Sequence, residues 1–341
     1  MATKKEEKQF EKERKAAIKA RHKKMKEDGI EKYLTPEQIS YNRRKAVTGA
    51  AWPVFRFLIL LGLSFVILYP LLFMLSTAFR PPEQMSDPSI VWLPKSFTLD
   101  NAKDVWTVMR FDETLFNTIR LNLISSCLQV VTCSLTGYGF ARFKFKGKGL
   151  LFGIVILMII VPPQITSIPL YMQFRYPFGL DINGGLIDTA WAMYLPALFA
   201  NGIKAGLFIF IFRQFFRGLP KELEDAAYLD GCGPLRTYIT VMVPNAKSSF
   251  LTVFLFSIVW YWNDYYVSST FFDKNTTIAL ELKNLGANIQ MQLFNNQQVD
   301  QRSLMAWMEA GCILGIAPIL IMYVFLQRYF IEGVERSGLV G

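Results

Sequence analysis

The chain has 341 residues, 52% of them hydrophobic, and a formal net charge of +10. Its mean hydropathy is +0.26. Several runs of about twenty residues hold almost no charge, which is long enough to cross a hydrocarbon core of roughly 30 Å. These runs argue against a soluble domain. Because only helices satisfy their own backbone groups in lipid within a single run, the sequence predicts an all-α polytopic membrane protein.

The positive charge is concentrated before residue 45, where Lys and Arg alternate with Glu. This pattern predicts a charged cytoplasmic tail over residues 1–50 that is either solvated or held at an anionic lipid surface. Nucleic acid is not an expected partner, because the tail lacks the interleaved aromatic residues of a single-strand-binding groove. The single histidine, His22, lies in this tail, and the four cysteines have no zinc or disulfide spacing, so no metal site is expected.

Six membrane spans are expected in the remaining domain, residues 51–341. They lie at about 53–79, 115–141, 150–171, 187–212, 248–270 and 308–330. The first begins behind some fifty polar residues and is too long for a signal peptide. Basic residues gather in the tail, in 142–148, in 213–236 and in 328–336. These basic segments all lie on the cytoplasmic side of the membrane if six spans place both termini in the cytoplasm. The loop 214–247 is then cytoplasmic. The long polar loop 271–307 is extracytoplasmic and is expected to be functional or disordered.

One polar stretch, "LPKELEDAAYLDGCGPLRTYITVMVP" at 219–244, separates two apolar runs. Its acids gather in the first turns of a short predicted helix, where they complement the helix dipole. Gly231 follows Asp230 and is free to adopt the left-handed conformation that ends a helix. A short helix across the cytoplasmic end of a bundle is a docking element for a soluble protein. The residues assigned to it are Glu224, Asp225, Ala226, Ala227, Asp230, Gly231 and Pro244.

The same stretch carries a family resemblance. "EDAAYLDG" followed by "VMVP" is similar to the E-A-A…G…I-x-L-P signature of permease subunits in ABC-type importers. Asp225 stands at the glutamate position, with Glu224 directly before it, and Val241 and Val243 replace Ile and Leu. Four further segments resemble the maltose-type, carbohydrate-uptake branch: "NTIRLNLI", "GYGFARFKFKGKG", "VPPQITSIPLY" and "WNDYYVSSTFF". So does the C-terminal "LQRYFIEGVERSGLVG", and the resemblance covers residues 53–341.

The resemblance implies a type I ABC importer permease fold in a bacterial plasma membrane. It implies that this chain forms half of a sugar pathway with a second permease subunit, either a different chain or a second copy. Two ATPase subunits would bind ATP and Mg²⁺ and receive the docking helix, and an extracytoplasmic solute-binding protein would deliver the sugar. The chain has no G-x-x-x-x-G-K-[ST] phosphate loop. We therefore expect no cofactor in this chain and no enzymatic activity of its own.

Three polar residues within the spans are candidates for the translocation path: Lys204, Asn263 and Asp264. An ionisable residue inside a span faces the bundle interior or water, although Lys204 alternatively snorkels or pairs with a backbone carbonyl. Trp260 and Trp262 fit either sugar stacking or interfacial anchoring.

Two other functional classes compete with the importer. A stand-alone secondary transporter needs internal repeats or several buried charges, and apart from Lys204 the spans offer neither. The other class is a membrane enzyme or a scaffold. An enzyme needs convergent Asp, Glu, His or Ser residues in the spans, and the spans do not offer them. Co-purification with an ATPase separates the first class from the others.

Overall fold

The computed structural model describes residues 15–17, 19–20, 35–90, 92–180, 184–297 and 299–338. Most of the predicted charged tail therefore lies outside the described residues. The chain divides into two compact units, Met1–Leu71 and Leu72–Gly341. Every regular element in the described part is helical, which agrees with the predicted all-α class.

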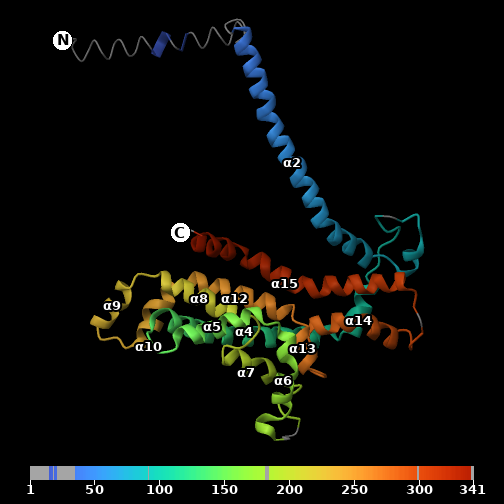
Figure 1. The fold of residues 1–341 in the computed structure, drawn as a ribbon. Coiled ribbons are helices and arrows are strands. Elements are labelled where there is room, and N and C mark those ends of the chain that lie inside the picture. Colours follow the sequence, from blue (N-terminus) through green and yellow to red (C-terminus); the bar gives the residue numbers. More distant parts are fainter. Residues whose placement is uncertain are drawn as a thin grey trace, which may run out of the picture. The chain divides into compact units, whose positions relative to one another are not determined.

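The first unit is dominated by the N-terminal part of α2 (Pro36–Ala78), the blue helix of Figure 1. Its stretch Trp52–Ala78 is long and apolar enough to cross a membrane. Large apolar side chains such as Phe57, Leu61 and Ile67 are exposed around this stretch. A helix that is hydrophobic all round is buried in lipid or protein. The first predicted span is thus confirmed as a helix, and this helix also continues upstream to Pro36.

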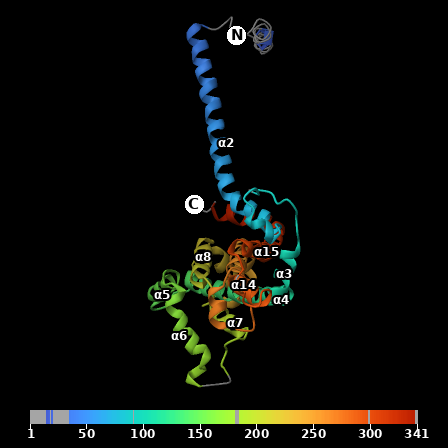
Figure 2. The ribbon, with the colours of Figure 1, turned by 90° about the vertical axis from the view of Figure 1, so that its right-hand side faces the viewer.

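The second unit contains the remaining helices (Figures 1 and 2). Up to the middle of the chain these are η2 (Pro82–Ser86), α3 (Asp100–Val108), α4 (Phe111–Arg142), α5 (Lys148–Ile160), α6 (Pro163–Arg175), η3 (Pro177–Gly179), α7 (Trp191–Leu198) and α8 (Ala205–Gly218). They continue with α9 (Glu222–Leu229), α10 (Pro234–Thr237), the π-helical turn η4 (Tyr238–Met242), α11 (Val243–Asn245), α12 (Lys247–Trp262), α13 (Tyr266–Phe271), α14 (Ile278–Gln292) and α15 (Gln301–Gly338).

Helix α4 is the centre of this unit and packs against α7, α8 and α12. A Cβ atom at Gly137 would lie 2.6 Å from the Cβ of Phe212, so the glycine permits α4 and α8 to approach closely. Polar side chains on α4 are buried and bonded across the bundle. Ser257 Oγ donates to Ser126 Oγ at 3.0 Å. This combination of small residues and interhelical hydrogen bonds is typical of membrane helix packing.

The spans are less regular than six unbroken helices. Among the described residues, three helices can cross a membrane by length and composition, or five if each of two bent pairs counts as one span. The third predicted span bends by 103° between α5 and α6, at Pro162 and Pro163. The fourth is divided into α7 and α8, because Ala200 and Lys204 adopt positive φ angles of 53° and 60°. The fifth ends at Trp262 and resumes as the short helix α13.

The polar loop 271–307, which the sequence predicts to be functional or disordered, contains a packed helix over residues 278–292. Thr277 caps α14 by accepting a hydrogen bond from Leu280 N. Ile278, Leu285 and Ile289 are buried against α3 and α15. Their spacing is that of one helical face. Burial of this face holds α14 to the bundle.

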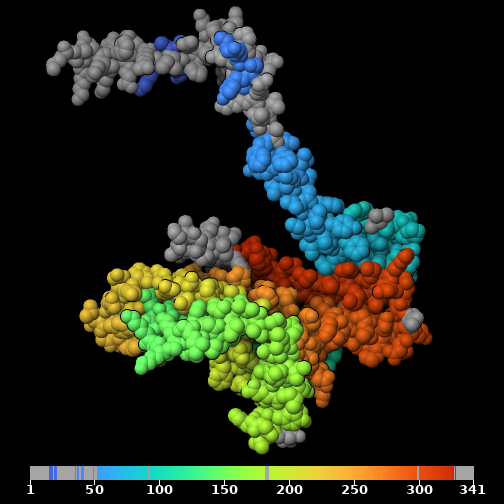
Figure 3. Space-filling view, viewed as in Figure 1, coloured from blue at the N-terminus to red at the C-terminus, as the bar shows by residue number. Residues whose placement is uncertain are grey.

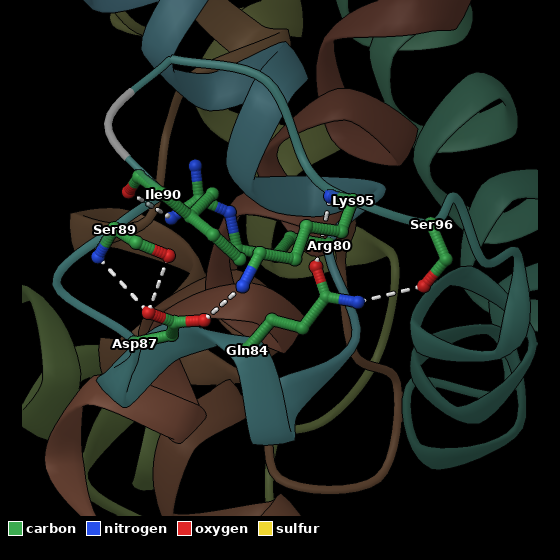
Figure 4. Close-up of polar contacts among 7 residues, drawn as sticks. All are labelled: Arg80, Gln84, Asp87, Ser89, Ile90, Lys95 and Ser96. Atoms are coloured by element: carbon green, nitrogen blue, oxygen red, sulfur yellow. Dashed lines mark hydrogen bonds and ion pairs between the residues drawn. The ribbon is translucent and has the colours of Figure 1, made fainter.

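Polar contacts also order the loop between α2 and α3 (Figure 4). Lys95 Nζ lies 2.6 Å from Asp87 Oδ2, and Gln84 Nε2 donates to Ser96 Oγ at 2.7 Å. The hydrogen bonds from Lys95 and then Ser89 hold the pKa of Asp87 well below its usual value. This loop is therefore a compact turn, not an extended linker.

Candidate coupling segment and translocation site

Residues 219–245 form what we call the coupling segment, which contains α9, α10, η4 and α11. It lies at one end of the second unit, and its atoms, gold in Figure 3, are at the surface. Glu222, Glu224 and Asp225 occupy the first turn of α9, as predicted. The helix ends at Leu229, with Asp230 as its C-cap, and Gly231 follows with φ of 78°. Gly231 N donates to Tyr228 O at 3.0 Å, which closes the predicted left-handed turn.

Two adjacent acids in α9 face opposite ways. Glu224 is 6% exposed, whereas Asp225 is exposed. Tyr138 OH donates to Glu224 Oε1 at 2.8 Å, and Arg142 Nε lies 3.1 Å from Glu224 Oε2. Both Tyr138 and Arg142 belong to α4. Glu224 therefore anchors α9 to the central helix, and Asp225 remains available at the surface.

Further contacts join the coupling segment to α4. Arg142 donates from an Nη atom to Leu219 O at 2.7 Å. Ser134 Oγ and Tyr238 OH are 2.6 Å apart. The rings of Tyr138 and Tyr238 have centroids 5.1 Å apart. Because these contacts tie α9 and η4 to α4, displacement of α9 is expected to move the adjoining end of α4.

The outer face of the coupling segment is partly apolar. Leu229 is 89% exposed, Leu235 is 62% exposed and Ile239 is 56% exposed. Asp225, Ala226 and Pro244 are exposed as well, whereas Ala227 is buried beneath them. Exposed apolar side chains rimmed by charge are typical of a protein–protein contact. The sequence signature alone did not separate the buried Glu224 and Ala227 from this outer face.

The break between α7 and α8 is held by α4 and α12. Gln129 Nε2 donates to Ile203 O at 2.5 Å, and Tyr261 OH donates to Gln129 Oε1 at 2.6 Å. A Cβ atom at Gly202 would collide with both the Gln129 amide and the Tyr261 hydroxyl. Irregular backbone at membrane depth is tolerated where protein groups satisfy it, and Gln129 meets this requirement. Sequence reasoning did not identify Gln129.

The three predicted path residues have different surroundings. Lys204 is exposed, and its Nζ lies 4.6 Å from the ring centroid of Trp260, also exposed. Asn263 is exposed, and its side-chain amide donates to Val259 O at 2.8 Å. Asp264 instead accepts backbone hydrogen bonds from the first turn of α13, including one from Ser268 N at 3.0 Å. Its carboxylate therefore has a structural role.

Trp262 fits neither of the predicted alternatives. It is 8% exposed, and its Nε1 donates to Gly315 O in α15 at 3.1 Å. One wall of a cavity of about 380 Å³ is formed by this tryptophan. The other lining residues are Asn263, Tyr265, Ile278, Ala279, Leu282, Lys283, Gly315, Ile316 and Ile319. The cavity lies between the end of α12, α14 and α15.

Asp188 forms a latch between the segment before α7 and the loop between α13 and α14. Its Oδ1 accepts hydrogen bonds from the backbone N–H groups of Asp273, Lys274 and Asn275, at 3.1, 2.9 and 3.0 Å. Partial burial acts to raise the pKa of Asp188, but these donors outweigh it and lower the pKa below its usual value. A carboxylate that accepts several backbone N–H bonds is expected to stay ionised. No sequence pattern indicated this contact.

Comparison with known proteins places this geometry in a family. Residues 133–336 match the family described as binding-protein-dependent transport system inner membrane component. The chain belongs to this family. The predicted resemblance is also confirmed by curated relatives named as sugar transport permeases.

Two of these relatives align over most of the chain. The arabinooligosaccharides transport system permease protein AraQ of Halalkalibacterium halodurans is 29% identical over 85% of this chain and 98% of its own length. The maltodextrin transport system permease protein MdxG of Bacillus subtilis is 29% identical over 84% of this chain and 95% of its own. A crystal structure of a bacterial ABC transporter involved in the import of the acidic polysaccharide alginate matches with a TM-score of 0.65. That match covers 84% of this chain and 98% of the other, at 18% identity, and shows a shared fold.

Proposed function

We propose that this chain is the permease subunit of an ATP-driven importer and forms half of the pathway for a sugar or oligosaccharide across a bacterial plasma membrane. The names of the curated relatives support the substrate class. The observation that carries the proposal is that the adjacent acids Glu224 and Asp225 face in opposite directions. The first is buried against α4, and the second is exposed on a surface of the coupling segment.

In this proposal ATP and Mg²⁺ are bound by two partner ATPase subunits. Each ATPase subunit binds the outer face of a coupling segment, formed by Asp225, Ala226, Leu229 and the exposed residues around them. Closure of the ATPase dimer displaces α9. The Arg142–Glu224 ion pair transmits this displacement to α4, and the continuous chain through η4 transmits it to α12. The bundle then switches between inward-facing and outward-facing states.

The proposed topology has six spans with both termini in the cytoplasm. It counts α5 with α6 and α7 with α8 as one interrupted span each. Interrupted helices are common where a membrane protein lines a pathway. The basic connection 142–148 and the coupling segment then share the cytoplasmic side, in agreement with the distribution of Lys and Arg.

The remaining partners follow from the same proposal. A second, homologous permease subunit completes the pathway, with Lys204 and Asn263 facing it and membrane lipid around the other spans. An extracytoplasmic solute-binding protein delivers the sugar to the outer loops, among which the latch of Asp188 and helix α14 provide ordered surface. No nucleic acid takes part.

The test is purification of the affinity-tagged chain from gently solubilised native membranes, followed by identification of all bound proteins. We expect a second permease and an ATPase. The substitution Asp225→Lys reverses an exposed charge and is expected to release the ATPase while the second permease stays bound. Asp273→Lys is the matched control, because it reverses an exposed acid on the opposite side of the bundle. Recovery of the chain alone, with sugar uptake that needs no ATP, would instead favour a secondary transporter.

A further inference from the structure

The exposed pair of Lys204 and Trp260 is unusual for its depth. The coupling segment follows α8, which has 14 residues and is therefore ~21 Å long. Lys204 directly precedes this helix, so it lies about 20 Å from the end that joins the coupling segment. Trp260 lies near the opposite end of α12 from Lys247, at a similar depth. In a hydrocarbon core of roughly 30 Å, the pair is far from the cytoplasmic surface.

A lysine at this depth needs a polar environment. Its four-carbon stem is too short to bring the ammonium group to the cytoplasmic interface. The side chain instead reaches Trp260, with Nζ 4.6 Å from the ring centroid. An intramembrane charge faces a bundle interior or a water-filled cavity. Because Lys204 is exposed in the single chain, the surface that it shares with Trp260 must face the pathway and not lipid.

The chain leaves this cation without an anionic partner. Within the described ranges, no carboxylate of Asp or Glu lies within ion-pair distance of Lys204. The backbone around it is already satisfied, since Gln129 binds Ile203 O and Ala205 N donates to Gly202 O. The backbone next to Lys204 is also held in place, because Gln129 Nε2 donates to Ile203 O. A fixed cation in a low-dielectric pathway favours an anion among the solutes that pass it.

We propose that Lys204 and Trp260 form a subsite for a carboxylate-bearing sugar unit, so that the transported carbohydrate is an acidic oligosaccharide. This inference rests on the proposed function. Lys204 Nζ lies over the Trp260 ring, and the part of the ring that remains exposed offers an apolar surface to the C–H face of a pyranose whose carboxylate Nζ binds. The aromatic face and the cation are both needed, because a neutral sugar would use only the first.

The experiment uses the assembled transporter in lipid vesicles with its binding protein. Vesicles are supplied with ATP and a mixture of plant and algal oligosaccharides, presented with a matched sample in which the uronate carboxylates have been reduced to alcohols. Mass spectrometry identifies what accumulates inside. We expect the wild type to take up uronate-containing oligosaccharides. We expect Lys204→Met to raise the apparent KM for them roughly tenfold to a hundredfold, the value of a hydrogen bond to a charged group.

Three variants sharpen the result. Lys204→Arg keeps the cation and is expected to retain uptake of acidic sugars. Trp260→Leu is expected to weaken uptake of acidic and neutral sugars alike. Lys144→Met removes an exposed lysine from the loop after α4 and is the matched control.

Uptake of neutral oligosaccharides alone by the wild type would overturn the subsite and leave the importer intact. So would equal loss of acidic and neutral uptake in Lys204→Met, because the lysine would then hold the assembly together without reading the substrate. If no oligosaccharide entered with the wild type, the proposed function would fail, and the subsite with it.

Discussion

Arg142 Nε lies 3.1 Å from Glu224 Oε2, and the two side chains are only 7% and 8% exposed. The arginine ends the long central helix α4, and the glutamate is in the first turn of α9. The pair therefore joins a membrane-crossing element to the segment proposed to bind an ATPase. Buried pairs are costly to form but still more costly to break, so this contact behaves as a rigid joint.

Neutralising the buried acid is expected to damage this joint. Glu224→Gln keeps the side-chain size but leaves Arg142 as an unpaired buried charge, which costs about 3–5 kcal/mol. The thermal unfolding temperature of the purified chain should fall clearly. Glu222→Gln, in the same turn but exposed, should leave that temperature nearly unchanged. Equal stability of the two variants would show that the Arg142–Glu224 pair contributes nothing.

The turn after α9 gives a second prediction. Gly231 has φ of 78°, and a Cβ atom added there would meet open space. The cost of Gly231→Val is therefore backbone strain alone, about 1–2 kcal/mol. We expect the transporter to assemble but to hydrolyse ATP without transport, because the coupling helix is misdirected. Gly233→Val is the control: Gly233 has φ of −76° and also faces open space. Full sugar uptake by Gly231→Val would contradict the role of this turn.

The coupling segment was predictable in outline but not in its two faces. The spacing from Asp225 to Gly231 and Pro244 defined the helix, the left-handed turn and the family. It did not reveal that Glu224 turns inward, since the partner, Arg142, is distant in sequence and was interpreted only as a basic loop residue. Pairings of this kind depend on how α4 and α9 pack, which residue spacing within one segment does not determine.

The break between α7 and α8 gives a third prediction. A methyl group at Gly202 would collide with Gln129 and Tyr261, and overpacking costs about 1–3 kcal/mol. Gly202→Ala should lower both the unfolding temperature and sugar uptake. Gly149→Ala, in α5 with open space around it, should change neither. Unaltered uptake by Gly202→Ala at normal expression would mean that the break adapts freely.

The latch formed by Asp188 gives a prediction that depends on pH. Asp188→Asn should increase hydrogen exchange at the amides of residues 273–275, because a neutral amide oxygen accepts their hydrogen bonds more weakly. The native pKa of Asp188 is below the usual value of about 3.9. The stabilisation by these hydrogen bonds is therefore fully present above the usual pKa of about 3.9. It is lost as the pH falls through the native pKa of Asp188.

Protection of these amides should accordingly differ between wild type and Asp188→Asn by the same amount at pH 7 and pH 5. The difference should disappear in strong acid. Asp273→Asn is the control, since it removes a neighbouring exposed carboxylate. A difference that already declined between pH 7 and pH 5 would mean that the carboxylate is not held in its charged form.

The spans show where sequence reasoning stops. Apolar length located the three described helices that are long and apolar enough to cross a membrane, because lipid tolerates little else. It did not locate the interruptions at Ala200 and Lys204, which depend on Gln129 from α4, nor the helix α14, whose buried face is diluted by polar residues. Lys204 was identified by its charge alone. Its neighbour Trp260 became meaningful only when α8 and α12 were seen together.

The π-helical turn η4 accommodates one more residue per turn than an α-helix, directly before Pro244 and α12. The number of residues in η4 therefore determines how the coupling segment is joined to α12 and the proposed path. Removing a single residue from Tyr238–Met242 would rotate the following turn by about 100° about the η4 axis, and α12, which follows across a bend of 81°, would be redirected. Trp260 would then no longer lie against Lys204, although neither side chain had been changed. In the proposed importer, substrate recognition is thus expected to be sensitive to insertions and deletions in η4, a segment outside the proposed subsite.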